Sequence, residues 1–310
     1  MSVIHNVKSK KRKSGARSKD TVFIGGIFAV SVFLLCIFFF RNDVIVVEPA
    51  NAPMNEPVSA FVNEPTNAQA ATPLLAPPAE SAPEPEQPVP NKGKLVFVID
   101  DAGNNLSELE PFLNFPGPLT IAVLPRLPNS VEAARLIREA GKEVFLHQPM
   151  ESLAGHNPGP GAVFIGMDED EIRYIINSNL DEIWPVSGLN NHEGSKVSMD
   201  NRIMEIVLDI CRERGIIFLD SRTTSETVAP LAARRLGMRI MERDVFLDNE
   251  KDRDSIIHYI NTGLLKAQSN GSVIMIGHAY TGELALVLSE FFRTWQNDGY
   301  TLSTVSDLMK

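Results

Sequence analysis

The stretch Leu95-Val96-Phe97-Val98-Ile99-Asp100-Asp101-Ala102-Gly103 decides how this chain folds. Its first five residues are apolar and mostly β-branched, which is typical of a strand buried on both faces. The run ends at two adjacent carboxylates and a glycine. In α/β proteins, the end of a buried strand is where chemistry takes place. Because successive side chains of a strand point in opposite directions, we expect Asp100 and Asp101 to have separate environments and separate roles.

From Lys94 onward, short apolar runs alternate with amphipathic segments, which is the pattern of parallel β/α units. Helices are predicted over Val131–Ala140 and Met199–Arg214, and Asp168 with Glu171 forms a capping-box pattern that opens a helix reaching Asn179. Seven or eight such units either close into a barrel or form an open sheet, and periodicity alone does not decide between them. The expected strands are Lys94–Ile99, Leu119–Val123, Glu143–Leu146, Val186–Leu189, Ile216–Leu219, Arg239–Met241, Ser272–Ile276 and Tyr300–Ser303.

The charge of the chain is unevenly distributed around its net value of −10. Seven of the first twenty residues are Lys or Arg, whereas residues 93–310 carry 20 basic and 31 acidic side chains, a net charge of −11. So acidic a body argues against nucleic acid or an anionic membrane surface as its ligand. The two cysteines, Cys36 and Cys211, lie in different segments, so neither a disulfide within the body nor a cysteine-based zinc site is available.

An uncharged apolar run, Thr21–Phe40, follows the basic segment 1–20. At about 1.5 Å rise per residue it reaches about 30 Å, the thickness of the hydrocarbon core of a bilayer. It predicts a single transmembrane helix whose basic flank stays cytoplasmic, so that everything after Arg41 is extracytoplasmic. A cleaved signal peptide is the alternative, since Ala50-Asn51-Ala52 resembles a cleavage site, but the apolar run is long and that site lies far from it.

Residues 41–92 are rich in Pro, Ala and Glu, with eleven prolines between Pro49 and Pro90. This composition cannot bury a core and predicts a disordered, extended linker. The remaining residues, 93–310, are long enough for one α/β domain with a full core.

Polar side chains follow several of the expected strands. Because the carboxyl ends of parallel strands share one edge of a sheet, we expect these residues to meet there. Three of the six histidines of the chain are among them. The residues are Asp100 and Asp101, His147, the run Asn190-Asn191-His192-Glu193-Gly194-Ser195, Asp220-Ser221-Arg222, and His278.

One carboxylate and two imidazoles form a common ligand set for Zn²⁺ or another divalent first-row metal. We therefore predict Asp101, His147 and His192 as metal ligands, with zinc as the expected ion. Asp100 would then act as a general base toward water, and His278 as an acid that protonates a leaving group.

Each of these residues also has a plainer interpretation. An Asp-Asp pair after a buried strand occurs in phosphoacceptor receiver domains, but those need a third Asp where this chain has His147. His147 is compatible with a hydrogen-bonded core histidine, and the run around His192 with a simple turn. Asp220 is compatible with a helix cap paired to Arg222. The remaining histidines, His5, His156 and His258, are assigned no role in the site.

Taken together, these motifs resemble the polysaccharide deacetylase superfamily, and most closely its divergent, membrane-anchored envelope branch. The resemblance covers nearly all of residues 94–310. It rests on Val98-Ile99-Asp100-Asp101, Gly141-Lys142-Glu143-Val144-Phe145-Leu146-His147 with Pro149-Met150-Glu151, Asn190-Asn191-His192-Glu193-Gly194-Ser195, Phe218-Leu219-Asp220-Ser221-Arg222 and Ile276-Gly277-His278.

The resemblance implies a distorted (β/α) barrel of about seven strands and metal-dependent removal of acetyl groups from N-acetylated sugars. It matches Asp100 to the base, Asp101 and His147 to ligands, and His278 to the last motif. The chain departs from the family pattern where a second ligand histidine is replaced by Glu151. The Arg-Pro-rich third motif is missing, and Ala279 follows the last histidine. Either His192 supplies the missing ligand, or Glu151 binds the metal itself. Asn191, Asp220 and Arg222 are further candidates to bind or support the metal.

These observations predict a single-pass protein of the cytoplasmic membrane whose extracytoplasmic domain deacetylates N- or O-acetylated cell-envelope glycan. A catalytically silent, glycan-binding or scaffold protein is the main alternative, because motif elements are missing. A metal-dependent hydrolase of another ester or phosphoester is a third.

Overall fold

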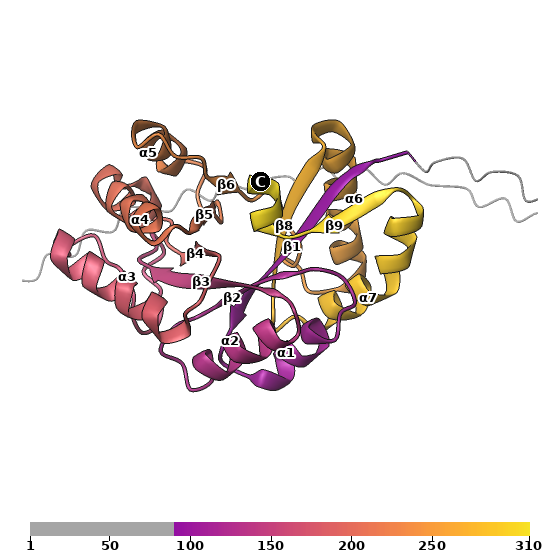
Figure 1. Cartoon of the computed structure of the whole chain (residues 1–310), viewed down its shortest axis with the longest axis horizontal. Coiled ribbons are helices and arrows are strands. Elements are labelled where there is room, and N and C mark those ends of the chain that lie inside the picture. Colours follow the sequence, from indigo (N-terminus) through magenta and orange to yellow (C-terminus); the bar gives the residue numbers. More distant parts are fainter. Residues whose placement is uncertain (1–89) are drawn as a thin grey trace, which may run out of the picture. The chain divides into compact units, whose positions relative to one another are not determined.

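Strand β1, Gly93–Ala102, lies at the centre of the sheet in a computed structural model that describes residues 90–310 (Figure 1). All five residues from Leu95 to Ile99 are fully buried. Leu95, Phe97 and Ile99 pack in the core between the sheet and the helices, whereas Val96 and Val98 pack in a smaller core on the opposite face. The apolar run is unbroken because both faces of this strand are covered.

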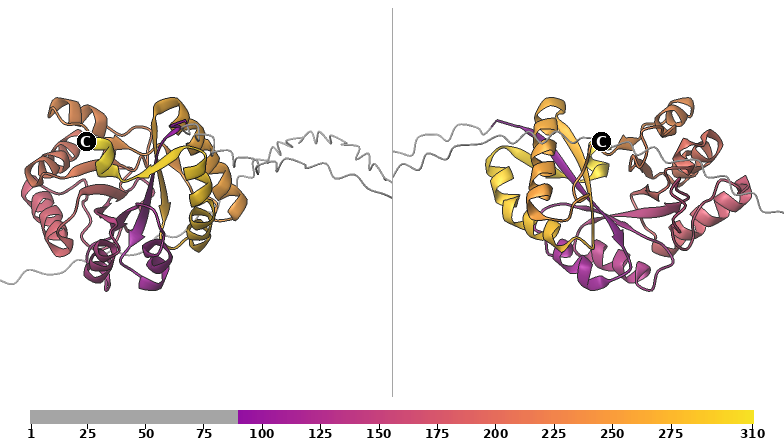
Figure 2. Two further views of the ribbon diagram at one scale, coloured as in Figure 1. Left: turned by 45° about the vertical axis from the view of Figure 1, so that its right-hand side comes forward. Right: turned by 180° about the vertical axis from the view of Figure 1, so that it is seen from behind.

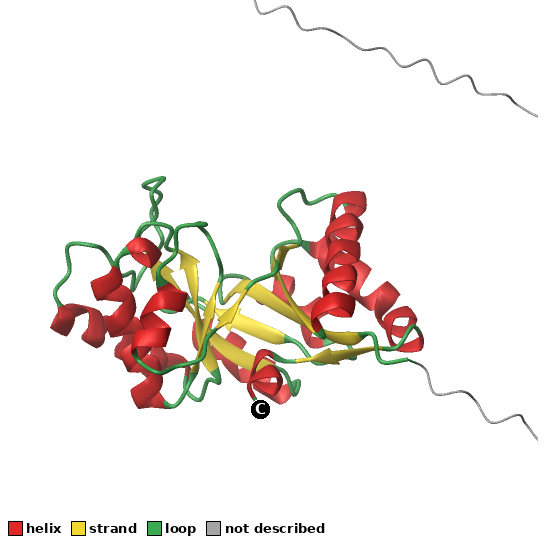
Figure 3. Cartoon of the chain, turned by 90° about the horizontal axis from the view of Figure 1, so that it is seen from above, coloured by secondary structure: helices red, strands yellow, loops and turns green. Residues whose placement is uncertain are grey.

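Strands and helices alternate along most of the described chain, as the sequence predicts (Figure 3). A 3₁₀ turn, Val197–Met199, precedes α4. The remaining elements are α1 (Leu106–Leu113), β2 (Thr120–Val123), α2 (Ser130–Glu139), β3 (Glu143–Met150), α3 (Glu169–Ile183), β4 (Gly188–Glu193), α4 (Asn201–Arg214), β5 (Ile217–Asp220), α5 (Ala229–Arg235), β6 (Met241–Glu242), β7 (Val245–Phe246), α6 (Arg253–Asn270), β8 (Ser272–His278), α7 (Gly282–Asn297), β9 (Tyr300–Ser303) and α8 (Val305–Met309).

The nine strands form one parallel sheet in the order β6-β5-β4-β3-β2-β1-β8-β7, with β9 paired to the first residues of β1. The sheet curls into a half-barrel, and helices cover its outer face (Figure 2). The predicted parallel α/β architecture is confirmed. The expectation of about seven strands differs from the nine observed, partly because the segment Met241–Phe246 contributes two short strands. Of these, β6 pairs with β5 and β7 pairs with β8.

The predicted helix starts and stops are largely confirmed. In α3, Asp168 and Glu171 form the expected capping box, with each side chain accepting a hydrogen bond from the backbone N–H of the other. The helix continues beyond Asn179 to Ile183. Helix α4 starts two residues later than predicted because Asp200 caps it, and it ends at Gly215 in the left-handed conformation.

The concave face of the curled sheet holds a small apolar core. Helix α8 covers this core at the amino ends of the strands, where the backbone N–H of Val305 donates to Thr120 Oγ1 and Glu143 Oε2, both at 3.1 Å. Catalytic groups expected at the carboxyl ends therefore lie at the opposite end of the strands. The core residues are Val96, Val98, Ala122, Phe145, Leu219, Ile274, Ile276 and Val305.

Within residues 90–310, none of the helices is both long and apolar enough to cross a membrane. The predicted basic tail 1–20, the predicted transmembrane helix 21–40 and the predicted linker up to residue 89 lie outside the described residues.

Candidate active site

The carboxyl ends of β1, β3, β4 and β8 bring the predicted site residues together. The parallel register places His278 beside Asp100, and the β3–β4 pairing places Asn190 beside His147 and His192 beside Pro149. Several strands extend further toward this edge than the apolar runs suggest. As a result, Asp100, His147 and His192 lie within strands and His278 is the last residue of β8, so none of the four belongs to a loop that follows a strand.

Three side chains form a compact triangle at this edge. Asp101 Oδ1 lies 3.2 Å from His147 Nε2 and 2.9 Å from His192 Nδ1, and the two imidazole nitrogens are 3.1 Å apart. Ligands of a tetrahedral metal with bonds of about 2.0–2.1 Å are separated by about 3.3 Å, so these atoms are spaced as ligands of one ion would be. All three are the residues predicted as ligands.

The oxygen at the corner of this triangle also supports a cation. Asp101 Oδ1 is buried and has no hydrogen-bond partner among the described residues, although His147 Nε2 and His192 Nδ1 lie close to it. A buried carboxylate oxygen left unpaired is costly, and a divalent cation would satisfy it. One carboxylate and two imidazoles are also a donor set that Zn²⁺ accepts. The residues present therefore fit a divalent metal.

The separate environments predicted for Asp100 and Asp101 are not observed. His147 Nε2 lies 3.7 Å from Asp100 Oδ2 and 3.2 Å from Asp101 Oδ1, so both carboxylates approach the same imidazole. The reason is a break in the strand, since Asp101 has a φ of 64° and the register of β1 shifts between Ile99 and Ala102. The alternation of side chains holds only for regular strands.

Left-handed backbone recurs at this edge of the sheet. Glu193, with a φ of 50°, ends β4, and Arg222, with a φ of 53°, follows β5. This conformation is unfavourable for residues other than glycine and is concentrated at functional sites in proteins. Strained backbone at Asp101, Glu193 and Arg222 is therefore consistent with an active site here.

The charges of the site perturb one another. Burial raises the pKa of Asp100. Burial alone would also raise the pKa of Asp101, but the imidazoles of His147 and His192 hold it well below its usual range. Burial lowers the basicity of His147, yet the adjacent carboxylates outweigh it and raise the pKa of His147 to about 9. Such mutual perturbation in one cluster is typical of functional sites.

His278 is held from one side by Asp248, a residue that the sequence analysis does not identify. Asp248 Oδ1 lies 3.0 Å from His278 Nδ1, and Asp248 Oδ2 accepts a hydrogen bond of 2.9 Å from the backbone N–H of His278. Burial opposes protonation of His278, but the carboxylate of Asp248 raises its pKa above the ordinary value. The only sequence signal for Asp248 is its place after the short apolar run Val245-Phe246-Leu247.

Aromatic rings fix the other faces of His278. Tyr280 stacks on the imidazole with ring centroids 4.9 Å apart and planes 10° apart, and Phe246 packs against it at 5.2 Å. Tyr280 also lines a cavity of about 290 Å³ next to Asp101. The other residues that line this cavity are Asn104, Glu108, Leu124 and Leu127.

Glu151, the alternative ligand, is not brought to the triangle. Its carboxylate instead contacts Lys196 Nζ and accepts a hydrogen bond of 2.9 Å from the backbone N–H of Ile165. These contacts join the start of the loop between β3 and α3 to Ile165, later in the same loop, and to Lys196, after β4. Among the described residues, the group arranged for a metal consists of Asp101, His147 and His192.

The other supporting candidates organise loops rather than contact the triangle. Asp220 accepts hydrogen bonds from the backbone of Arg222 and from Thr227 Oγ1. The Arg222 guanidinium pairs with Glu242 rather than with Asp220. Asn191 accepts a hydrogen bond from the backbone N–H of Ser221 and donates one to the carbonyl of Glu193, and so joins β4 to the loop after β5.

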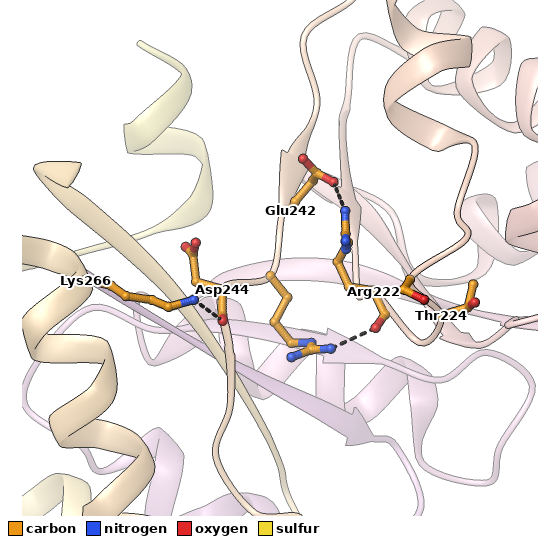
Figure 4. Close-up of a pocket in the computed structure, with 7 residues that line it drawn as sticks. Arg222, Thr224, Glu242, Asp244 and Lys266 are labelled. Atoms are coloured by element: carbon orange, nitrogen blue, oxygen red, sulfur yellow. Dashed lines mark hydrogen bonds and ion pairs between the residues drawn. The ribbon is translucent and has the colours of Figure 1, made fainter. Parts of the chain in front are cut away.

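A larger cavity of about 470 Å³ lies beside the segment that links β6 and β7 (Figure 4). Its charged side chains are engaged with one another or with the backbone. Arg222 pairs with Glu242, and Lys266 donates to the carbonyl of Asp244. None of the triangle residues lines it, so we place the candidate active site at the smaller cavity. The lining residues are Arg222, Thr224, Ser225, Glu242, Arg243, Asp244 and Lys266.

Comparison with known proteins identifies relatives over the described domain. Residues 97–309 match a family model described as divergent polysaccharide deacetylase. An uncharacterized protein of Haemophilus influenzae is 27% identical over 196 residues, which are 63% of this chain and 70% of that protein. The uncharacterized protein YibQ of Escherichia coli K12 is 35% identical over 188 residues, which are 61% of this chain and 59% of that protein.

The fold is also found among solved structures. The crystal structure of an uncharacterized protein from Agrobacterium tumefaciens C58 is similar, with a TM-score of 0.65 and 21% sequence identity. The match covers 71% of this chain and 90% of that one. At this level of identity the likeness shows a shared fold.

Proposed function

Because the chain belongs to the divergent polysaccharide deacetylase family, we propose that it is a metal-dependent carbohydrate deacetylase of the cell envelope. The observation that carries the proposal is the triangle of Asp101, His147 and His192, with the buried carboxylate of Asp100 directly beside it. The proposed substrate is an N- or O-acetylated envelope glycan.

In this proposal Asp101, His147 and His192 hold a divalent cation, with zinc as the expected ion. When bound, the cation would polarise the acetyl carbonyl and make a water molecule more acidic. Asp101 is suited to bind the cation because the two imidazoles lower its pKa and so keep its carboxylate ionised.

Asp100 is the proposed general base. It is buried beside the triangle, and Asn190 Nδ2 donates a hydrogen bond of 2.9 Å to its Oδ1. Within residues 90–310 its other oxygen, Oδ2, accepts no hydrogen bond, since His147 Nε2 lies 3.7 Å away, and this leaves Oδ2 available to take a proton from water. Burial raises the pKa of Asp100 toward the working pH, which strengthens it as a base.

His278 is the proposed acid. Asp248 holds its Nδ1, which leaves Nε2 to donate a proton to the leaving group. For an N-acetyl sugar, the water oxygen bonds to the acetyl carbon and one water proton passes to Asp100. The C–N bond then breaks, and the nitrogen takes a proton from His278. The products are acetate and the free amine.

The proposed location follows from the amino-terminal sequence. The charge-free run Thr21–Phe40 and the basic residues before it favour a single membrane anchor with the domain outside the cytoplasm. The proline-rich residues 41–92 would serve as a tether that lets the domain reach cell-wall glycan.

The test is acetate release from N-acetylated glycan oligomers by the full chain, with Asp100→Asn as the matched variant. We expect release that requires a divalent metal and is lost in Asp100→Asn. Glycan binding by both proteins, with no acetate from either, would instead support the silent binding protein. Hydrolysis of simple esters without release from N-acetyl sugars would indicate the third class of hydrolase.

A further inference from the structure

Asn190 connects the proposed base to a proposed ligand. Its side chain is fully buried in the middle of β4. Asn190 Oδ1 lies 2.9 Å from His147 Nδ1, and Asn190 Nδ2 lies 2.9 Å from Asp100 Oδ1. His147 is its cross-strand neighbour, whereas Asp100 belongs to β1, two strands further along the sheet. One amide thus spans the concave face between two functional groups.

An amide has different chemistry at its two ends. The oxygen only accepts hydrogen bonds, so His147 donates its Nδ1–H to it, which leaves Nε2, on the side of Asp101 and His192, as the ring nitrogen that can bind a metal. The NH₂ group donates to Asp100 Oδ1 and, at 3.2 Å, to Ser221 Oγ. The reversed amide would place its oxygen against the Asp100 carboxylate oxygen 2.9 Å away and would leave the imidazole N–H facing a donor.

From this arrangement we propose that Asn190 is a positioning residue that sets the tautomer of His147 for metal binding and the orientation of Asp100 for proton transfer. The inference rests on the proposed function, since it assigns Asn190 to the proposed metal site and base. Partners that orient metal-ligating histidines in this way typically change metal affinity 10- to 100-fold when they are removed, so a loss of about that size is expected here.

The next residue provides a matched control. Asn191 is also buried, and its side chain makes hydrogen bonds to Ser221, Glu193 and Thr223, but none to the triangle or to Asp100. Successive residues of β4 point to opposite faces, so the two asparagines share their chemistry and burial, and both bond Ser221, but only Asn190 contacts His147 and Asp100. If zinc affinity depends only on having a buried amide, Asn190→Ala and Asn191→Ala should both weaken it. If it depends on the tautomer of His147, only Asn190→Ala should weaken it.

The experiment measures the affinity of the full chain for Zn²⁺ by competition with a chelator, in wild type, Asn190→Ala, Asn191→Ala and Asn190→Asp. We expect affinity to fall about 10- to 100-fold in Asn190→Ala and to stay near wild type in Asn191→Ala. Asn190→Asp keeps an acceptor for His147 Nδ1–H and should retain zinc. It should lose acetate release, because a carboxylate oxygen replaces the donor to Asp100.

Other outcomes separate this inference from the proposed function. Unchanged zinc affinity in Asn190→Ala, or equal losses in the two alanine variants, would overturn the role of Asn190 and leave the deacetylase proposal standing. If Asn190→Ala does not fold, weak zinc binding by Asn190→Asp would overturn it equally. Failure of wild type to bind zinc would overturn both. The expected affinities without acetate release from wild type would overturn only the proposed reaction.

Discussion

At the scale of single residues, Asp248 controls the proposed acid. It contacts both the imidazole and the backbone N–H of His278, and it raises the pKa of that imidazole. We expect Asp248→Asn to reduce acetate release by about 10- to 100-fold, since a hydrogen bond to a charged group is worth about 1.5–3 kcal/mol. The high-pH limb of the rate profile should also move to lower pH, because His278 would lose its proton earlier.

Asp244→Asn is the control for this prediction. Asp244 likewise uses its carboxylate to accept a backbone N–H of β8, that of Ile274 at 2.8 Å, but it makes no hydrogen bond or ion pair with a histidine of the described residues. A pH profile that moves equally in both variants, or in neither, would contradict the role given to Asp248. The measurement is the rate of acetate release between about pH 5 and pH 10. This range extends to both sides of the ordinary pKa of histidine, about 6.5.

The contact between His278 and Asp248 also makes the stability of the fold depend on pH. The folded pKa of His278 is raised, so its stabilisation is complete below the unfolded pKa and is lost as the pH rises through the folded value. Burial would raise the pKa of Asp248, but His278 lowers it. The stabilisation from Asp248 is therefore present above its unfolded pKa and is lost as the pH falls through the folded value.

Sequence reasoning identifies the members of the triangle but not their supports. Asp101, His147 and His192 can be grouped from the sequence because parallel strands bring their carboxyl ends to one edge. Asn190 acts through contacts between strands, and Asp248, which follows β7, contacts His278 at the end of β8; which side chains meet there depends on register. Nothing in the neighbouring sequence distinguishes Asn190 from Asn191.

At the scale of elements, the loop between β3 and α3 is held by Glu151. Because Glu151 contacts Lys196 and Ile165 rather than the triangle, we expect Glu151→Gln to leave zinc affinity unchanged. The loop should become easier to cleave, since the ion pair with Lys196 is lost. Zinc affinity and the rate of limited proteolysis measure the two effects. A large loss of zinc in Glu151→Gln, with no such loss in Lys196→Met, would return Glu151 to the ligand set.

Elements with strong local signals are the ones that the sequence predicts well. The capping box of α3 and the glycine stop of α4 are set by residues within one helical turn. Strand β7 is not predicted, because two residues carry no periodicity and Val245–Phe246 is a strand only through its pairing with β8.

At the scale of the whole molecule, α8 covers the concave core at the end of the strands opposite the site. We expect Val305→Ala to lower the free energy of unfolding by about 1–3 kcal/mol, through lost apolar burial and the cavity left behind. Zinc affinity should not change, because Val305 packs at the amino ends of β2 and β3. Denaturant unfolding measures the stability.

Lys310→Ala is the control in the same helical region, since the Lys310 side chain is 77% exposed. Its effect should stay within about 0.5 kcal/mol. If Val305→Ala were equally mild, the concave core would not depend on α8. If it also weakened zinc binding, the two ends of the half-barrel would be coupled.

The sequence by itself determined the parallel α/β class, the order of most strands and helices, and the edge at which Asp100, Asp101, His147, His192 and His278 gather. Those features depend on apolar periodicity and end signals, which lie within a few residues of one another along the chain. Only the tertiary structure decided that the two aspartates face one imidazole, that Asp248 holds His278, and that Asn190 rather than Asn191 faces the site. These contacts join distant strands, and they follow from register and from the left-handed backbone at Asp101.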